Sequence, residues 1–237
     1  MKKLTAEFRD LLHRVPPVLM ALMVLSIVGM NLLANKSINT GVDWLALDCG
    51  ILLSWLIFLT MDVMTHCFGP RAATMMSVLA LALNLFMAFI FFLASLIPGV
   101  WGESFVEGSE AVINTALDHT FGGTWYIILG SSIAFTASSL INNYLNDGIG
   151  KRLKKKEGFG IFAVRSYAST FIGQFADNLI FALLVSRVFF GWSWLQCFTC
   201  ALAGAVMELL FEVFFSPFGY RLSRKILAGE GAASTQR

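Results

Sequence analysis

The sequence predicts an all-α membrane protein with six transmembrane helices and both termini in the cytoplasm. Hydrophobic residues make up 57% of its 237 positions and charged residues only 14%, whereas soluble domains average about 45–50% and about 25%. Six stretches are long and apolar enough to cross a bilayer, which takes ~20 residues. The net charge of only +2 argues against nucleic-acid binding through bulk charge.

The six stretches define one integral-membrane domain that covers residues 1–237. They span residues about 16–35, 44–65, 73–98, 121–146, 160–187 and 193–217. The first stretch is interpreted as a span rather than a cleaved signal peptide. The reason is that Pro16-Pro17 opens it and no small-residue cleavage site follows cleanly.

The basic residues between the spans decide the orientation. If six spans alternate, fifteen of the seventeen Lys and Arg residues lie on one side, and only Lys36 and Arg187 lie on the other. The positive-inside rule places the fifteen, and with them both termini, in the cytoplasm. The basic run over residues 151–156 is then a topology anchor, a simpler reading than a site for anionic lipid. The opposite loop, 99–120, has apolar residues at helical spacing, so we expect a short interfacial helix there.

The fifth span carries the most informative polar residues. Four of them are spaced i, i+4, i+7 and i+8 and therefore share one face of a helix: Thr170, Gln174, Asp177 and Asn178. Ser169 and Gly173 beside them let another helix or a flat ligand approach closely. A purely structural stripe of hydrogen bonds between helices is the alternative. The carboxylate of Asp177 near mid-membrane favours a binding site, because ionisable residues at that depth usually face a cavity or a partner.

Other spans add polar pairs at i, i+4 spacing. These pairs are Asn31 with Asn35, Asp62 with His66, Asn142 with Asn146, and Glu208 with Glu212. Hydration at the membrane interface explains the pairs near helix ends equally well, whereas Glu208 lies deeper. The predicted substrate-binding residues are Asp177, Gln174, Asn178, Thr170, Glu208, Asp62, Asn142 and Asn31.

Signatures of catalysis and of cofactor binding are absent from the sequence. It contains no G-x-x-x-x-G-K-[ST] loop, no H-E-x-x-H pair and no nucleophile elbow. Cys197 and Cys200 have the spacing of a metal or redox motif, but they lack a second such pair and sit in an apolar run, which favours small-residue packing. We therefore predict no metal, no cofactor and no enzymatic activity. Carboxylates and amides inside a helix bundle suit a small polar solute, and together they match the donors and acceptors of a nucleobase edge.

The fifth span also resembles the signature of the queuosine-precursor transporter family (VUT family). The pattern R-x-x-x-S-T-x-x-G-Q-x-x-D-x-x-x-F is occupied here by Arg165, Ser169, Thr170, Gly173, Gln174, Asp177 and Phe181. The end of the second span, Asp62 to Gly69, resembles the same family, as does Ser216-Pro217, so the likeness extends over nearly the whole chain. It implies import of a 7-deazaguanine base, such as 7-cyano-7-deazaguanine or queuine, for tRNA queuosine salvage. The implied location is the cytoplasmic (inner) membrane of a bacterium.

Three positions depart from that family pattern. They are His66, Asn178 and Glu208, where the family often has an acidic residue, a small hydroxyl and a lysine. Because these positions fall among the candidate ligand residues, the departures bear on the exact substrate more than on the fold.

The sequence leaves three classes of function to compare. A stand-alone transporter or facilitator comes first. The alternative is a substrate-capture subunit of an ATPase-coupled vitamin or nucleobase importer, which six small helices suit equally, and a membrane enzyme is a distant third. The expected partners are the deazapurine substrate and membrane lipids, and the sequence also allows a homodimer.

Overall fold

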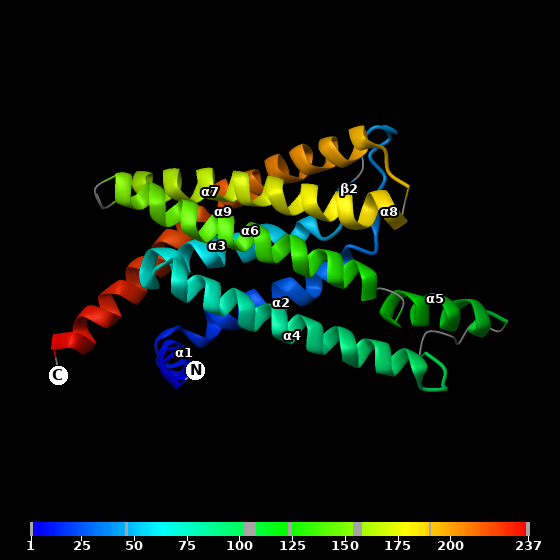
Figure 1. The fold of residues 1–237 in the computed structure, drawn as a ribbon, viewed down its shortest axis with the longest axis horizontal. Coiled ribbons are helices and arrows are strands. Elements are labelled where there is room, and N and C mark those ends of the chain that lie inside the picture. The colour runs from blue at the N-terminus through cyan, green and yellow to red at the C-terminus, as the bar shows by residue number, and fades with distance from the viewer. Residues whose placement is uncertain are drawn as a thin grey trace.

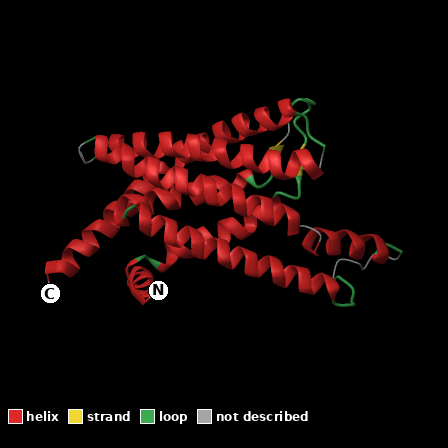
Figure 2. Ribbon diagram, in the orientation of Figure 1, coloured by secondary structure: helices red, strands yellow, loops and turns green. Residues whose placement is uncertain are grey.

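A computed structural model describes residues 2–45, 47–101, 108–122, 125–153, 158–189 and 191–235. The chain is an all-α, multi-span membrane protein in which long helices run side by side (Figures 1 and 2). The helices are α1 (Lys2–Arg14), α2 (Pro17–Leu33), α3 (Ile51–Phe68), α4 (Pro70–Leu96), α5 (Glu110–Gly122), α6 (Trp125–Arg152), α7 (Phe159–Phe181), α8 (Arg187–Phe189) and α9 (Trp194–Thr235). A π-helical turn, η1 (Ala182–Ser186), joins α7 to α8, and strands β1 (Ser37–Ile38) and β2 (Leu47–Asp48) form one antiparallel pair.

Five helical segments of the described chain are long and apolar enough to cross a membrane by themselves. They begin in α3, α4, α5, α7 and α9, and the segment that begins in α5 runs on through α6. The sixth predicted span corresponds to α2, which has 17 residues and passes the same test only together with α1. Those two helices meet at an angle of 103°, because Pro16-Pro17 lies at the junction and proline cannot continue the hydrogen bonds of a preceding helix.

Several spans begin or end away from the predicted positions. The second span begins at Ile51 rather than near residue 44, because β2 and a turn at Gly50 come first. Asp48 holds that turn, since its Oδ1 accepts a hydrogen bond of 2.7 Å from the backbone N–H of Gly50. α9 continues past Pro217 to Thr235, well beyond the predicted end of the sixth span. Helices in membranes tolerate proline where their neighbours satisfy the freed backbone groups.

The loops gather at two ends of the bundle, as six alternating spans require. One end, here called the termini end, holds α1, the α3–α4 turn at Gly69 and the last turns of α9 (Figure 1). The other end, the strand end, holds β1, β2, α5 and α8 (Figure 1). The helix expected within 99–120 is present as α5. That the termini end faces the cytoplasm stays a prediction, and Lys154–Lys156 and Arg237, which entered the charge comparison, lie outside the described residues.

The hydrophobic core lies around α3, mainly where α3 packs against α2 and α4. Large apolar side chains such as Phe58, Met61 and Phe135 are at most 2% exposed. Gly173 lets α7 approach α3 and α6 closely, because a Cβ there would lie 2.8 Å from the Phe58 ring and 3.2 Å from Cβ of Asn142. The prediction that a small residue on the fifth span admits close neighbours is therefore confirmed at Gly173. This packing brings the polar faces of α3, α6, α7 and α9 together.

Candidate functional site

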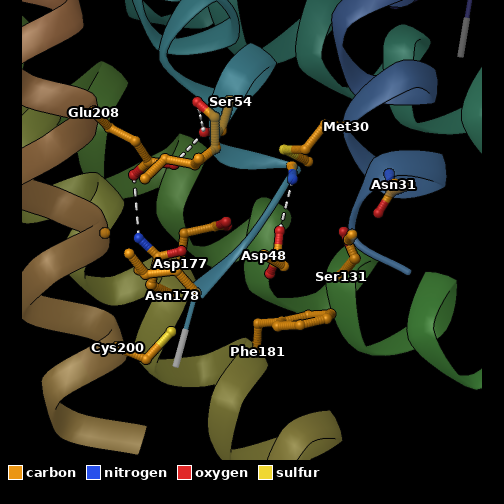
Figure 3. Close-up of a pocket in the computed structure, with 15 residues that line it drawn as sticks. Met30, Asn31, Asp48, Ser54, Ser131, Asp177, Asn178, Phe181, Cys200 and Glu208 are labelled. Atoms are coloured by element: carbon orange, nitrogen blue, oxygen red, sulfur yellow. Dashed lines mark hydrogen bonds between the residues drawn. The ribbon is translucent and has the colours of Figure 1, made fainter. Parts of the chain in front are cut away.

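A cavity opens among the helices near the strand end of the bundle (Figure 3). Helices α2, α3, α6, α7 and α9 and strand β2 contribute to its wall. Its lining residues are Met30, Asn31, Ala34, Leu47, Asp48, Gly50, Ile51, Ser54, Ser131, Asp177, Asn178, Phe181, Cys200, Gly204 and Glu208. Apolar and small residues thus surround three carboxylates and two amides, a composition typical of small-molecule sites.

Asp177 enters the cavity from α7, seven residues beyond Thr170 on the predicted polar face. Its Oδ1 accepts a hydrogen bond of 2.6 Å from the Ser138 hydroxyl on α6. The donor comes from a neighbouring helix, which fixes the carboxylate against the wall while leaving Oδ2 for other partners. Such a carboxylate can accept further hydrogen bonds from a ligand.

Glu208 faces Asp177 and Asn178 across the cavity from α9 (Figure 3). Its side chain is 2% exposed. Asn178 Nδ2 donates to Glu208 Oε2 at 3.1 Å, and the Ser54 hydroxyl of α3 donates to Oε1. Gly204, one turn earlier on α9, makes this geometry feasible, because a Cβ there would lie 2.7 Å from Asn178 Nδ2.

Two further polar residues reach the cavity from the strand-end side. Asp48 belongs to β2, and burial raises the pKa of its carboxyl to about 6, against a partly opposing hydrogen bond from Gly50. Asn31 belongs to α2, where its Nδ2 donates to the carbonyl oxygen of Ile27 at 2.9 Å. Both residues add acceptors to the wall opposite α7 and α9.

A second acidic cluster lies deeper, outside the cavity lining. Its centre is the inner acid pair, Asp62 on α3 and Glu212 on α9, both 0% exposed. Asp62 Oδ1 accepts from Asn142 Nδ2 at 2.8 Å, and Asp62 Oδ2 accepts from the hydroxyls of Ser166 at 2.5 Å and Thr170 at 3.2 Å. The Ser166 hydroxyl also contacts Glu212 Oε1. Ser54 and Asp62, which mark the two clusters on α3, are eight residues apart, about 12 Å along a helix rising ~1.5 Å per residue.

The predicted binding residues are therefore divided between two places. Asn31, Asp177, Asn178 and Glu208 line the cavity, whereas Asp62, Asn142 and Thr170 form the inner cluster. Gln174 belongs to neither set of contacts: it is 0% exposed, and neither amide atom has a hydrogen-bond partner among the described residues. The polar face of α7 is thus real, but it serves two clusters at different depths.

The sequence analysis did not single out several residues that complete these clusters. They are Asp48, Ser54, Ser131, Ser138 and Ser166. Asp48 was missed although the predicted second span, 44–65, contains it, because it has no polar residue four positions before or after it, where Trp44 and Leu52 stand. The serines carry little signal in a sequence, since a helical serine most often bonds its own backbone, as Ser138 also does to Phe135 at 3.2 Å.

Arg165 lies at the termini end of α7 and points across α6. Its Nη2 donates to Asn146 Oδ1 at 2.8 Å, and its Nη1 lies 3.1 Å from His66 Nδ1. Gly150 gives it room, because a Cβ there would lie 2.6 Å from the guanidinium carbon. Arg165 and His66 therefore contact each other on the side of the inner acid pair that faces the termini end. His66 lies one turn beyond Asp62 on α3.

No group of three or more His, Cys, Asp or Glu side chains in the described part of the chain is arranged to hold a metal ion. Cys197 and Cys200 are free thiols and are buried. The Cys197 thiol points to the carbonyl oxygen of Ala182 at 3.5 Å. Cys197 therefore packs where α9 meets η1, whereas Cys200 lines the cavity.

A comparison with protein families finds one match over this architecture. The family is described as "Putative vitamin uptake transporter", and its pattern matches residues 48–222. That range holds α3, α4, α6 and α7, the start of α9 and both acidic clusters, whereas Asn31 lies before it. No match is found among curated proteins or among solved structures. Since the match covers well over half of the chain, this protein belongs to the vitamin uptake transporter family.

Proposed function

We propose that this transporter imports a 7-deazaguanine base, a queuosine precursor such as 7-cyano-7-deazaguanine or queuine, across a bacterial cytoplasmic membrane. One observation carries the proposal. Two carboxylates, Asp177 and Glu208, and the amide of Asn178 line one cavity, and each comes from a membrane-spanning helix.

The polar groups of the cavity suit the edge of a guanine-like base. That edge presents a ring N–H and an exocyclic amino group side by side, and a carboxylate has two oxygens with which to accept from both. The neighbouring ring carbonyl needs a donor, which the Asn178 amide can supply, because its Nδ2 carries a second hydrogen beside the one donated to Glu208. Hydrogen bonds to a charged acceptor are roughly twice as strong as neutral ones.

The apolar part of the wall suits the flat rings of the base. Phe181 and Met30 line the cavity beside the polar groups. At Gly204 and Gly50, which also line it, no side chain separates the backbone from the cavity. The sequence resemblance supports the same substrate class, because Gln174, Asp177 and Phe181 lie on the matching helix. The family membership by itself supports uptake of a vitamin-like solute, and the deazaguanine assignment is the finer proposal.

Binding measurements on the purified chain test the substrate class. Queuine and 7-cyano-7-deazaguanine should bind, and an analogue that lacks only the 2-amino group should bind at least about 10-fold more weakly, because it leaves a buried carboxylate oxygen unpaired. Equal affinity for a base and for its analogue without the 2-amino group would show that the carboxylates do not bind this edge.

Uptake into liposomes separates a stand-alone transporter from a capture subunit. Liposomes that contain only this chain, and no ATPase, should take up labelled queuine and exchange it for unlabelled queuine inside. Binding without any exchange would instead favour a subunit that depends on a separate ATPase.

A further inference from the structure

We infer that the inner acid pair, Asp62 and Glu212, binds one proton and couples substrate uptake to the proton gradient. This inference rests on the transport function proposed above and adds a second site to it. Glu212 follows Glu208 by one turn on α9, and Asp62 follows Ser54 by about two turns on α3. The substrate cavity and the proton site therefore share these helices.

The hydrogen bonds around Ser166 require a proton on one of the two carboxyl groups. The Ser166 hydroxyl lies within hydrogen-bond distance of both Asp62 Oδ2 and Glu212 Oε1. It has a single hydrogen, so it can donate to only one of them. Both contacts are hydrogen bonds only if one carboxyl carries a proton and donates it to the Ser166 oxygen.

The other donors show which carboxyl carries the proton. Asp62 accepts from Asn142 and Thr170 as well as from Ser166, an environment that stabilises a carboxylate. Glu212 Oε1 contacts Ser166, the side chains of Thr170 and Asp62 also lie close to this carboxyl group, and its Oε2 has no hydrogen-bond partner among the described residues. The arrangement is therefore a protonated Glu212 that donates to Ser166, which in turn donates to a charged Asp62.

No cation of the described residues forms an ion pair with either carboxyl group, although the Arg165 charge on α7 attracts Asp62 from beyond ion-pair distance. The ion pairs found in the described part of the chain are Arg14–Asp10, Arg71–Glu7 and Lys151–Asp147, and none includes Asp62 or Glu212. On α7, Arg165 donates to Asn146 and lies against His66. α2 has no charged residue, and Arg71 is the one charged residue of α4. Two ionised carboxylates buried side by side are strongly unfavourable, and one proton removes half of that charge.

Unpartnered polar atoms next to the pair point to a bound water or ion. Glu212 Oε2, Asn142 Oδ1 and both amide atoms of Gln174 are buried without a partner among the described residues. Buried polar atoms of this kind mark places where water or an ion binds. Gln174 lies one turn above Thr170 on α7, towards the cavity, so these atoms outline a hydrated route between the substrate site and Glu212.

The coupling step is balanced in charge. A proton from water on the strand-end side forms an O–H bond with Glu212 and changes the charge of the pair from −2 to −1. The neutral base binds in the cavity, the helices rearrange, and the O–H bond breaks as the proton passes to water at the termini end. Each base therefore enters with one positive charge, so an inside-negative membrane potential drives uptake as well.

Transport by the purified full chain in liposomes tests the coupling, with labelled queuine as the probe. An inward proton gradient should drive accumulation above the external concentration, a protonophore should abolish it, and replacement of sodium by choline should leave it unchanged. Glu212→Gln should lose gradient-driven accumulation but keep the exchange of labelled for unlabelled queuine. Glu7→Gln is the matched control, because Glu7 lies on α1 and pairs with Arg71.

A second variant keeps both carboxyl groups and removes the bridge between them. Ser166→Ala removes two hydrogen bonds from the protonated pair but only one from the ionised pair. The variant therefore disfavours the protonated form, and the pH midpoint of uptake should move down by about one unit. Ser77→Ala, a buried serine of α4 that bonds the carbonyl oxygen of Ala73, is its control and should keep the parent midpoint.

The proton on Glu212 can also be observed without substrate. Infrared difference spectra between acidic and alkaline buffer should show a carboxyl C=O band that Glu212→Gln lacks and Glu7→Gln retains. If the parent protein binds and exchanges queuine but shows neither this band nor accumulation under a proton gradient, the inference is wrong and the proposed function stands. If no deazaguanine binds while the band is present, the substrate proposal fails and the proton site stands.

Discussion

At the scale of single residues, the position of each carboxylate along its helix decides its chemistry. Asp177 is half-buried and lines a cavity, whereas Asp62 is fully buried and enclosed by donors from Asn142, Ser166, Ser169 and Thr170. A carboxylate whose donors are all protein groups has little capacity left for a ligand. A carboxylate with one protein donor has an oxygen available, and Asp177 is therefore the residue on which we expect substrate affinity to depend most.

Replacement of Asp177 by Asn tests that expectation. The change keeps the size of the side chain but replaces a charged acceptor by a neutral amide, and such a bond is worth roughly 1.5–3 kcal/mol, so affinity for queuine should fall about 10- to 150-fold. Equilibrium binding to the purified variant measures the effect. Asp10→Asn on α1, where Asp10 is an exposed partner of Arg14, should bind like the parent. Parent-like binding by a folded Asp177→Asn protein would move the site elsewhere.

Asp48 gives a residue-level prediction about pH. Its folded pKa of about 6 lies above the ordinary value of 3.8, so the folded state holds this proton more tightly than the unfolded state does. The resulting stabilisation is full below the ordinary value and is lost as pH rises through about 6. Thermal unfolding in detergent should show a fall in melting temperature over that range, and the fall should be smaller in Asp48→Asn. An unchanged pH profile in Asp48→Asn would contradict the assignment.

At the scale of elements, glycines set the distance between helices and so the contacts between their polar faces. Gly173 lets α7 meet α3 and α6, and Gly204 lets α9 meet Asn178 of α7. Small residues at such crossings are the usual means of close packing in membranes. The contact from Asn178 to Glu208 therefore depends on a residue that has no polar group of its own.

The variant Gly204→Ala tests this dependence. Its new Cβ would lie 2.7 Å from Asn178 Nδ2, so the amide must leave Glu208, and queuine affinity should fall about 10-fold if one such contact is lost. Gly148→Ala on α6 is the control, because nothing lies within 4 Å of a Cβ there. If both variants bind queuine equally well, the Asn178 amide is not part of the substrate site.

At the scale of the whole molecule, the two acidic clusters lie one below the other across the bundle. The cavity opens near the strand end, and the inner acid pair and Arg165 follow towards the termini end. α3, α7 and α9 contribute to both clusters, so a movement of any of them affects both. This stacking is the structural basis for coupling a solute to a proton.

The direction of transport depends on which end faces the cytoplasm, and cysteine labelling determines it. Glu110→Cys at the strand end should react with an impermeant thiol reagent in intact cells. Lys151→Cys at the termini end should react only after the membrane is permeabilised, because the basic residues gather there. The parent protein, whose own cysteines are half-buried or buried, provides the background. Labelling of Lys151→Cys in intact cells would show that the orientation is the opposite of the predicted one.

The amino-acid sequence by itself determined the helical class, the grouping of loops at two ends and the polar face of α7. These features depend on composition, on the length of apolar stretches and on the 3.6-residue period, all of which are local properties of the chain. The family signature around Gln174 and Asp177 also lies within one helix. The match over residues 48–222 confirms that the chain belongs to a transporter family, which is a coarser statement than the predicted deazaguanine specificity.

The tertiary structure alone decided how the polar residues are divided. Asp62 and Glu212 are 150 residues apart in the chain, and only the packing of α3 and α9 against α7 brings both to Ser166. The cavity likewise needs Asp48 from a strand pair that no helical pattern indicates. Periodicity shows which face of a helix is polar, but the depth and rotation of neighbouring helices decide which polar groups meet. The depth and rotation of the helices are set by side-chain packing between segments far apart in the sequence.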